Sequence, residues 1–298
     1  MITLASLATA FLERPGLAQS TLRSYQSTLI PLLSEYGRWS VESISRQVLW
    51  EYLNRLTDVS YTTHHRHQAV ITALFNFAVD MEYLKSNPVA GLTRRKPNRE
   101  RGEHAKLEAV RYLTPNQLSI LYHVIKKDAR LSALVRLLHS SGARIAEVLA
   151  LNLEQIDCKA RKFQVVGKGN KQRWCFYSEV AQWSLNNYLK YYRYPTHSAL
   201  FTAQQPKTFV VSRLSYRMAH KSWTSLIGNA TELQGVRLHD LRHTFATERV
   251  GLMGIEELRA LMGHESIQTT LRYQKVTPQR AEQVAHQAFN SLPSGLSS

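Results

Sequence analysis

Cysteine is almost absent from this chain. Its 298 residues include two cysteines, Cys158 and Cys175, and no C-x-x-C pair. The absence of that spacing argues against the common cysteine-based zinc and redox motifs. So few cysteines in a chain of this length are typical of the reducing cytoplasm, which is where we expect the protein to act.

Long hydrophobic runs are also missing. No stretch approaches the ~18 uninterrupted apolar residues of a transmembrane helix. The N-terminal MITLASLATAFLERP has no positive charge ahead of its apolar residues, unlike a secretion signal. We therefore expect no membrane association. Apolar residues still make up 44% of the chain and charged residues 20%, which is the balance of a globular protein with a core.

Acidic residues are scarce. The chain has 22 Asp and Glu against 38 Lys and Arg, a formal net charge of +16. Such an excess favours a polyanionic partner, with nucleic acid ahead of an anionic membrane surface. It indicates electrostatic affinity and does not by itself specify a partner.

The periodicity of the sequence predicts two domains, as does the length at ~150 residues per domain. Apolar residues recur at helical spacing over residues 20–37, 45–56 and 63–84. We predict a helical domain over residues 1–90, a basic linker over 91–108 and a larger domain over 109–298.

The predicted linker is poor in large apolar residues and rich in cations, so it reads as an exposed connection. Its charge would also suit a strap lying along a phosphate backbone. The candidate DNA-binding residues in it are Arg94, Arg95, Lys96, Arg99 and Arg101.

The larger domain is predicted to be mainly α with a small antiparallel sheet. Thr114 before Pro115 is a typical helix start. Residues 132–153 predict a helix, a turn and a second helix. Two β-type runs flank GKGN within residues 161–178, which predicts a hairpin.

Chemistry-bearing residues gather in four stretches of this domain. In SGARIAEV, Arg144 stands at a helix start, where a cation opposes the macrodipole, and Glu147 is three residues on and able to hold it. In GKGNKQR, Lys168 stands at the hairpin tip between two glycines. Each residue alone is equally compatible with an exposed basic side chain.

The third stretch, LHDLRHTFAT, supports two hypotheses. His239 and Arg242 share a helix face, as a polar helix surface or as part of a site. His239 and His243 are spaced i, i+4, so with His264 they could also bind zinc. Asp240 weakens that hypothesis, since it is shorter than the Glu of the H-E-x-x-H pattern.

The fourth stretch, GHESIQTTLRYQ, places Tyr273 nine residues after His264. His264 follows Gly263, a plausible helix C-cap. Ser266 can cap a short helix whose apolar pair faces away from Tyr273. Taken alone, this tyrosine reads as structural.

Together, the four stretches carry their polar residues in one order: Arg144, Lys168, His239, Arg242, His264 and Tyr273. With GKGNKQR, LHDLRHTFAT and LMGHESIQTTLRYQ, this order is similar to the tyrosine site-specific recombinases, or phage integrase family, over about residues 110–285. The chain departs from that pattern at Ala143, where Leu is commoner, and in YQK, where Tyr-x-His is frequent. It resembles the two-domain, Xer-like type, with a core-binding domain before the catalytic domain.

The resemblance implies that Tyr273 attacks a DNA phosphodiester and holds the strand as a 3′-phosphotyrosine. A tyrosine hydroxyl with a pKa of about 10 needs help to act as a nucleophile at neutral pH. Arg144 and Arg242 would bind the non-bridging oxygens of the phosphate, and His264 would add a hydrogen bond.

The remaining roles are implied in the same way. Lys168 would protonate the leaving 5′ oxygen, His239 would assist proton transfer at the nucleophile, and Glu147 would orient Arg144 or His239. Lys171 and Arg173 would contact DNA. No metal or other cofactor is implied, since cationic side chains supply the electrostatics.

The resemblance further implies a homo-tetramer that joins two DNA duplexes at specific sites, and a nucleoid-associated location. Residues 277–292 read as a short helix that packs on its own domain or on a neighbouring subunit. Three other hypotheses remain open: a zinc hydrolase, a catalytically silent DNA-binding protein and a type IB topoisomerase.

Overall fold

The computed structural model describes residues 1–298 except 99, 104–109, 168–170 and 275–298. Its contacts divide the chain into two compact units, the N-terminal unit Met1–Glu108 and the C-terminal unit Ala109–Ser298. Within the described residues, no helix is long and apolar enough to cross a membrane.

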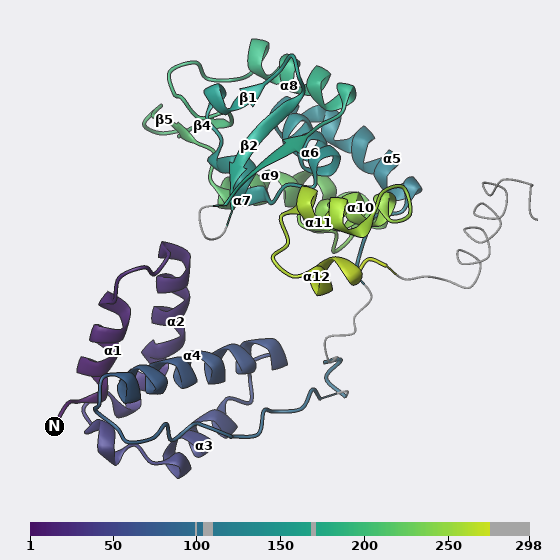
Figure 1. The fold of residues 1–298 in the computed structure, drawn as a ribbon. Coiled ribbons are helices and arrows are strands. Elements are labelled where there is room, and N and C mark those ends of the chain that lie inside the picture. Colours follow the sequence, from purple (N-terminus) through teal and green to yellow (C-terminus); the bar gives the residue numbers. More distant parts are fainter. Residues whose placement is uncertain (99, 104–109, 168–170, 275–298) are drawn as a thin grey trace, which may run out of the picture. The chain divides into compact units, whose positions relative to one another are not determined.

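The N-terminal unit is helical (Figure 1). Its helices are α1 (Leu4–Glu13), α2 (Gln19–Tyr36), α3 (Arg46–Arg55) and α4 (Tyr61–Asp80). Serine side chains cap two of them, because Ser45 and Ser60 accept hydrogen bonds from N–H groups in the first turns of α3 and α4. The apolar stripes meet in one core, in which Phe11, Leu29 and Ile71 are fully buried.

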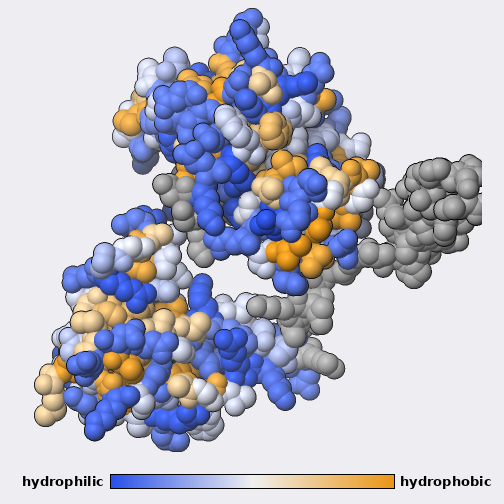
Figure 2. Space-filling view, in the orientation of Figure 1, coloured by the Kyte–Doolittle hydropathy of each residue, from blue (hydrophilic) through white to orange (hydrophobic). Residues whose placement is uncertain are grey.

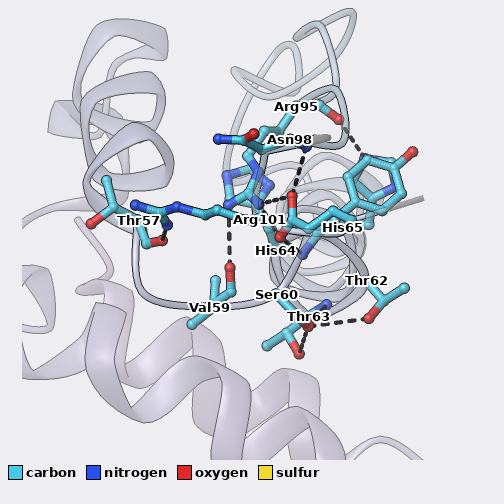
Figure 3. A network of polar contacts seen from close by, with 12 residues as sticks. Thr57, Val59, Ser60, Thr62, Thr63, His64, His65, Arg95, Asn98 and Arg101 are labelled. Atoms are coloured by element: carbon cyan, nitrogen blue, oxygen red, sulfur yellow. Dashed lines mark hydrogen bonds and ion pairs between the residues drawn. The ribbon is translucent and has the colours of Figure 1, made fainter. Parts of the chain in front are cut away.

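The described part of the basic segment is mostly exposed, as expected of a linker, but several of its side chains are bonded to this unit or to one another. The Arg95 guanidinium donates to both Glu103 carboxylate oxygens at 2.5 Å. Glu103 in turn accepts the N–H of Tyr61, the first residue of α4, at 2.7 Å. Arg101 donates to the carbonyl of Thr57 at 2.8 Å (Figure 3).

These contacts also change what the predicted DNA-binding residues of the segment can do. Arg95 is committed to protein acceptors and half-buried, whereas Arg94 and Lys96 are exposed. Arg101 is exposed although one of its nitrogens is occupied. Arg99 lies outside the described residues.

We predict that Glu103→Gln loosens this segment. A neutral amide cannot hold the Arg95 guanidinium as a carboxylate does, and the pKa of Glu103, lowered to about 2 mainly by Arg95, shows how strongly the charged form is favoured. Trypsin should therefore cleave after Arg94 and Arg95 several-fold faster than in the wild type. Glu100→Gln, the same charge change in the same segment, is the control. Equal cleavage rates in the two variants would contradict the prediction.

The C-terminal unit is built from helices around two small sheets, which confirms the predicted fold class (Figure 1). Its helices are α5 (Pro115–Val124), α6 (Ala129–Ser141), α7 (Ile145–Ala150), α8 (Glu179–Tyr191), α9 (Tyr216–Ile227), α10 (Asp240–Arg249), α11 (Ile255–Met262) and α12 (Ile267–Leu271). Thr114 caps α5 with Pro115 in its first turn, as predicted. Helix α6 packs against α8 and α10 and is buried over most of its surface.

The larger sheet has the antiparallel order β1-β2-β3, with β1 (Ile156–Asp157), β2 (Lys162–Val166) and β3 (Gln172–Phe176). Val166 pairs with Gln172 at the ends of β2 and β3 that the turn connects, so the predicted hairpin is confirmed. Its tip, including Lys168, lies outside the described residues. The second sheet pairs β4 (Thr202–Gln204) with β5 (Val211–Arg213).

Candidate active site

A tight turn between α6 and α7 places Arg144. Gly142 ends α6 in the left-handed conformation, with φ of 63°, and a Cβ added there would lie 2.3 Å from the Phe245 ring. Glycine is therefore required by both conformation and space. After this turn Arg144 is the N-cap residue of α7 with an extended backbone, and its side chain is 40% exposed.

Glu147 joins two arginines beneath this turn. Its carboxylate accepts from Arg144 Nη1 at 2.9 Å and from the Arg144 backbone N–H at 2.7 Å. It also accepts both terminal nitrogens of Arg173, at 2.8 and 2.7 Å. Burial opposes ionisation of Glu147, but the hydrogen bonds from Arg173 and Arg144 outweigh it and hold the carboxyl pKa below its ordinary value.

Arg173, which we predicted to contact DNA, has a mostly buried side chain. Its side chain is 11% exposed, and its Nε donates to the Leu261 carbonyl at 3.1 Å, so its guanidinium is used within the protein. All three nitrogens of this guanidinium therefore donate to protein acceptors, although Arg173 also contributes to the lining of the cleft described below. Lys171, the other predicted DNA-binding residue of the described hairpin, is exposed.

Arg242 lies in the interior, at 3% exposure. Its terminal nitrogens donate to the carbonyls of Gly142, at 2.5 Å, and Met262, at 2.6 Å. Burial, and then the positive charge of Arg144, lower the pKa of Arg242 to about 10, which still leaves it charged at neutral pH. Arg144 donates to the next carbonyl, that of Gly263, at 3.2 Å. The two guanidiniums therefore converge on the end of α11.

His264 comes directly after Gly263 at the end of α11, and Tyr273 packs against it. Tyr273 is 9% exposed, and the His264 ring stacks on it with centroids 6.3 Å apart. His264 Nδ1 is 2.9 Å from Thr270 Oγ1. Burial, followed by Arg242 and Arg144, lowers the pKa of His264 to about 4, whereas burial raises the pKa of Tyr273. Both side chains are therefore neutral at pH 7.

His243 is the residue that the sequence interpretation missed at this site. Its Nδ1 lies 2.7 Å from the Tyr273 hydroxyl. His239, which we expected to assist proton transfer at the nucleophile, is exposed, and its ring meets the edge of His243 with centroids 4.7 Å apart. His243 stands one helical turn from His239, a spacing that the sequence connects only with zinc binding.

A cleft of about 540 Å³ opens beside these residues. Arg144, Lys171, Arg259 and His264 contribute to its lining. Cationic and neutral hydrogen-bonding groups at the mouth, with buried Arg242 behind them, are suited to bind an anion such as a phosphodiester. On the visible face of this unit, hydrophilic residues predominate and an apolar group lies over α12 (Figure 2).

The described residues do not assemble the zinc site of the rival hypothesis. Among them, no three His, Cys, Asp or Glu side chains are grouped so that they could hold a metal ion. His243 and His264 are directed instead to Tyr273 and Thr270.

Comparison with known proteins decides the family. The model of the phage integrase family matches residues 111–280, more than half of the chain. The chain belongs to the phage integrase family. This confirms the resemblance noted in the sequence, and the activity of the family, cleavage and rejoining of DNA strands through a phosphotyrosine, is the activity of this recombinase.

Its curated relatives agree. The chain is 30% identical over 231 residues to tyrosine recombinase XerC of Haemophilus influenzae, covering 74% of this chain and 72% of the relative. It is 27% identical over 271 residues to XerC of Corynebacterium glutamicum, covering 89% and 84%. Tyrosine recombinase XerD of Haemophilus influenzae is 25% identical over 290 residues, covering 92% and 93%.

Solved structures share the fold. The Tn1549 transposon integrase in complex with a circular intermediate DNA superposes with a TM-score of 0.74 at 17% identity, over 97% of this chain and 100% of that one. XerH recombinase bound to its palindromic difH substrate gives 0.70 at 20% identity, over 96% and 84%. Both neighbours therefore have the mainly helical fold of this recombinase.

Proposed function

We propose that Tyr273 is the nucleophile of this recombinase and that Arg144, Arg242 and His264 bind the phosphate it attacks. The observation that carries the proposal is the convergence of both guanidiniums on the carbonyls of Met262 and Gly263, next to His264 and its stacked neighbour Tyr273. The arginines would stabilise charge on the non-bridging oxygens as it develops.

The proton transfers complete the proposal. Because burial raises the pKa of Tyr273, its hydroxyl is protonated before DNA binds and must lose the proton as the Oη–P bond forms. Lys168, at the hairpin tip, would protonate the departing 5′ oxygen, with His239 assisting at the nucleophile. The phosphotyrosine stores the bond energy, so rejoining needs no ATP, and the cations replace a metal.

The partner we propose is double-stranded DNA bearing specific recombination sites. The net charge of +16 supports it, as do the neighbours solved with DNA. Arg94, Lys96 and Lys171 are exposed and able to contact phosphates, with the N-terminal unit acting as the core-binding domain. A homo-tetramer would synapse two duplexes in the cytoplasm, and residues 277–292, outside the described residues, would dock on a neighbouring subunit.

The test is covalent trapping. The probe is a nicked duplex carrying the sequence that the protein selects from a random DNA pool, so that the strand end diffuses away after cleavage. We expect an SDS-resistant adduct whose modified peptide contains Tyr273, formed equally with and without a chelator. A silent DNA-binding protein would give no adduct, and a zinc enzyme would be inhibited by the chelator. Relaxation of supercoiled DNA without strand exchange would indicate a topoisomerase.

A further inference from the structure

The Tyr273 hydroxyl has a partner to which no role has been assigned so far. His243 Nδ1 lies 2.7 Å from Tyr273 Oη, and the two rings are tilted with centroids 5.6 Å apart. Resting on the proposed function of Tyr273, we propose that His243 is a positioning residue that holds the hydroxyl of the nucleophile through its Nδ1 atom.

The backbone of His243 is firmly placed. Its neighbours in the chain, Arg242 and Thr244, are both buried, at 3% and 0% exposure. Arg242 is bonded to Gly142 and Met262, and the Thr244 hydroxyl accepts the N–H of Leu113 at 2.9 Å. A side chain anchored between two such residues can hold a reacting atom in place, and a shift of ~1 Å can lower a rate ~10²-fold.

The protonation state of His243 suits an acceptor. Burial, and then the nearby His239, lower its pKa to about 4; Arg237 and Arg272 act in the same direction and Asp240 opposes them. The ring is therefore neutral at pH 7. With Nδ1 as the acceptor, the tyrosine hydroxyl donates a hydrogen bond to His243, which leaves the oxygen lone pairs directed elsewhere, free to meet a phosphorus atom.

His239 does not offer the same contact. It meets His243 ring to edge, and its own ring is exposed at the start of α10. The histidine in contact with the nucleophilic oxygen is therefore the second of the H-D-L-R-H stretch.

Three substitutions test the role of the Nδ1 atom. Asn places a polar atom near the position of Nδ1 and Gln near that of Nε2. We expect His243→Ala to lower the rate of adduct formation on the nicked duplex ~10²-fold at saturating DNA. His243→Asn should restore most of that rate and His243→Gln should not. His220→Ala, at an exposed histidine whose ring lies beside Tyr216, is the control and should match the wild type.

Two outcomes would overturn the proposal. An Asn variant as slow as Ala would mean that the imidazole itself is required, as a proton acceptor. If His243→Ala formed the adduct as fast as the wild type, His243 would have no role in the reaction. Thermal melting of each variant shows whether a lower rate of adduct formation results from unfolding.

A second measurement does not depend on activity. In protein labelled with ¹³Cζ-tyrosine, the Tyr273 resonance is the one missing from Tyr273→Phe. We expect His243→Ala to shift it and His243→Asn to return it towards the wild-type position. An unmoved resonance would refute the contact. If the wild type formed no adduct while the resonance moved as expected, the nucleophile assignment would fail, and with it the positioning role, while the hydrogen bond would stand.

Discussion

Replacing Tyr273 by Phe should abolish the covalent protein–DNA adduct while leaving DNA affinity unchanged. Phenylalanine keeps the ring that stacks on His264 and removes the oxygen that would attack phosphorus. The stability effect should be small, because one hydrogen bond to His243 is lost, a net change of about 1 kcal/mol or roughly 2–4 °C in Tm. Gel analysis of the nicked duplex after SDS treatment measures the first effect and calorimetry the second.

Tyr177→Phe is the matched control. Tyr177 lies in the same unit, is 6% exposed and donates its hydroxyl to Gln182 at 2.7 Å, so it resembles Tyr273 in burial and bonding. The two variants should lose similar stability, and Tyr273→Phe alone should lose the adduct. An adduct that persists in Tyr273→Phe would show that another side chain is the nucleophile.

The fold was accessible from the sequence where local signals agree with tertiary structure. Thr114 and Pro115 start α5 as capping preferences predict, and the strands beside Gly167 pair as a hairpin. These features depend on neighbours in the chain. The candidate site was inferred from the order of its residues along the chain, and the family to which that order pointed is the one whose model matches residues 111–280.

The partners of charged side chains were less accessible, because they come from distant parts of the chain. Arg173 is read from the sequence as one cation of a basic hairpin, yet it is buried against Glu147, 26 positions away. Arg95 is likewise read as a linker cation and is held by Glu103. Composition records the charge of each residue, but its burial and its partner depend on packing.

His243 was missed for a related reason. Its spacing from His239 placed both on one side of α10 and suggested a shared metal. The chain gave no sign that the Tyr273 hydroxyl, 30 positions later, would reach the second histidine rather than the first. Only the packing of α12 after the turn at Gly263 brings these groups together.

Glu147→Gln should damage both stability and activity, because this carboxylate neutralises two guanidiniums. Its side chain is 8% exposed, and removing one partner of a buried ion pair typically costs ~3–5 kcal/mol. We expect a fall in Tm on the order of 10 °C. Arg144 would lose the charged carboxylate that orients it at 2.9 Å, and the new amide NH2 would face guanidinium donors, so adduct formation should slow ~10²-fold even at temperatures where the variant is folded.

Glu179→Gln is the control, because Glu179 is 89% exposed and pairs with Arg161 at 3.5 Å, a surface contact worth about 0–1 kcal/mol.

The pH dependence of stability provides a second test of Glu147. The folded-state pKa of Glu147 is lowered, so its stabilisation is complete above the ordinary carboxyl pKa and is lost as pH falls through the folded value. The stability gap between wild type and Glu147→Gln should therefore be constant near neutral pH and narrow below about pH 4. If the stability difference between wild type and Glu147→Gln were small at pH 7, or the same at pH 3 as at pH 7, the ion pairs of Glu147 with Arg144 and Arg173 would not stabilise the fold.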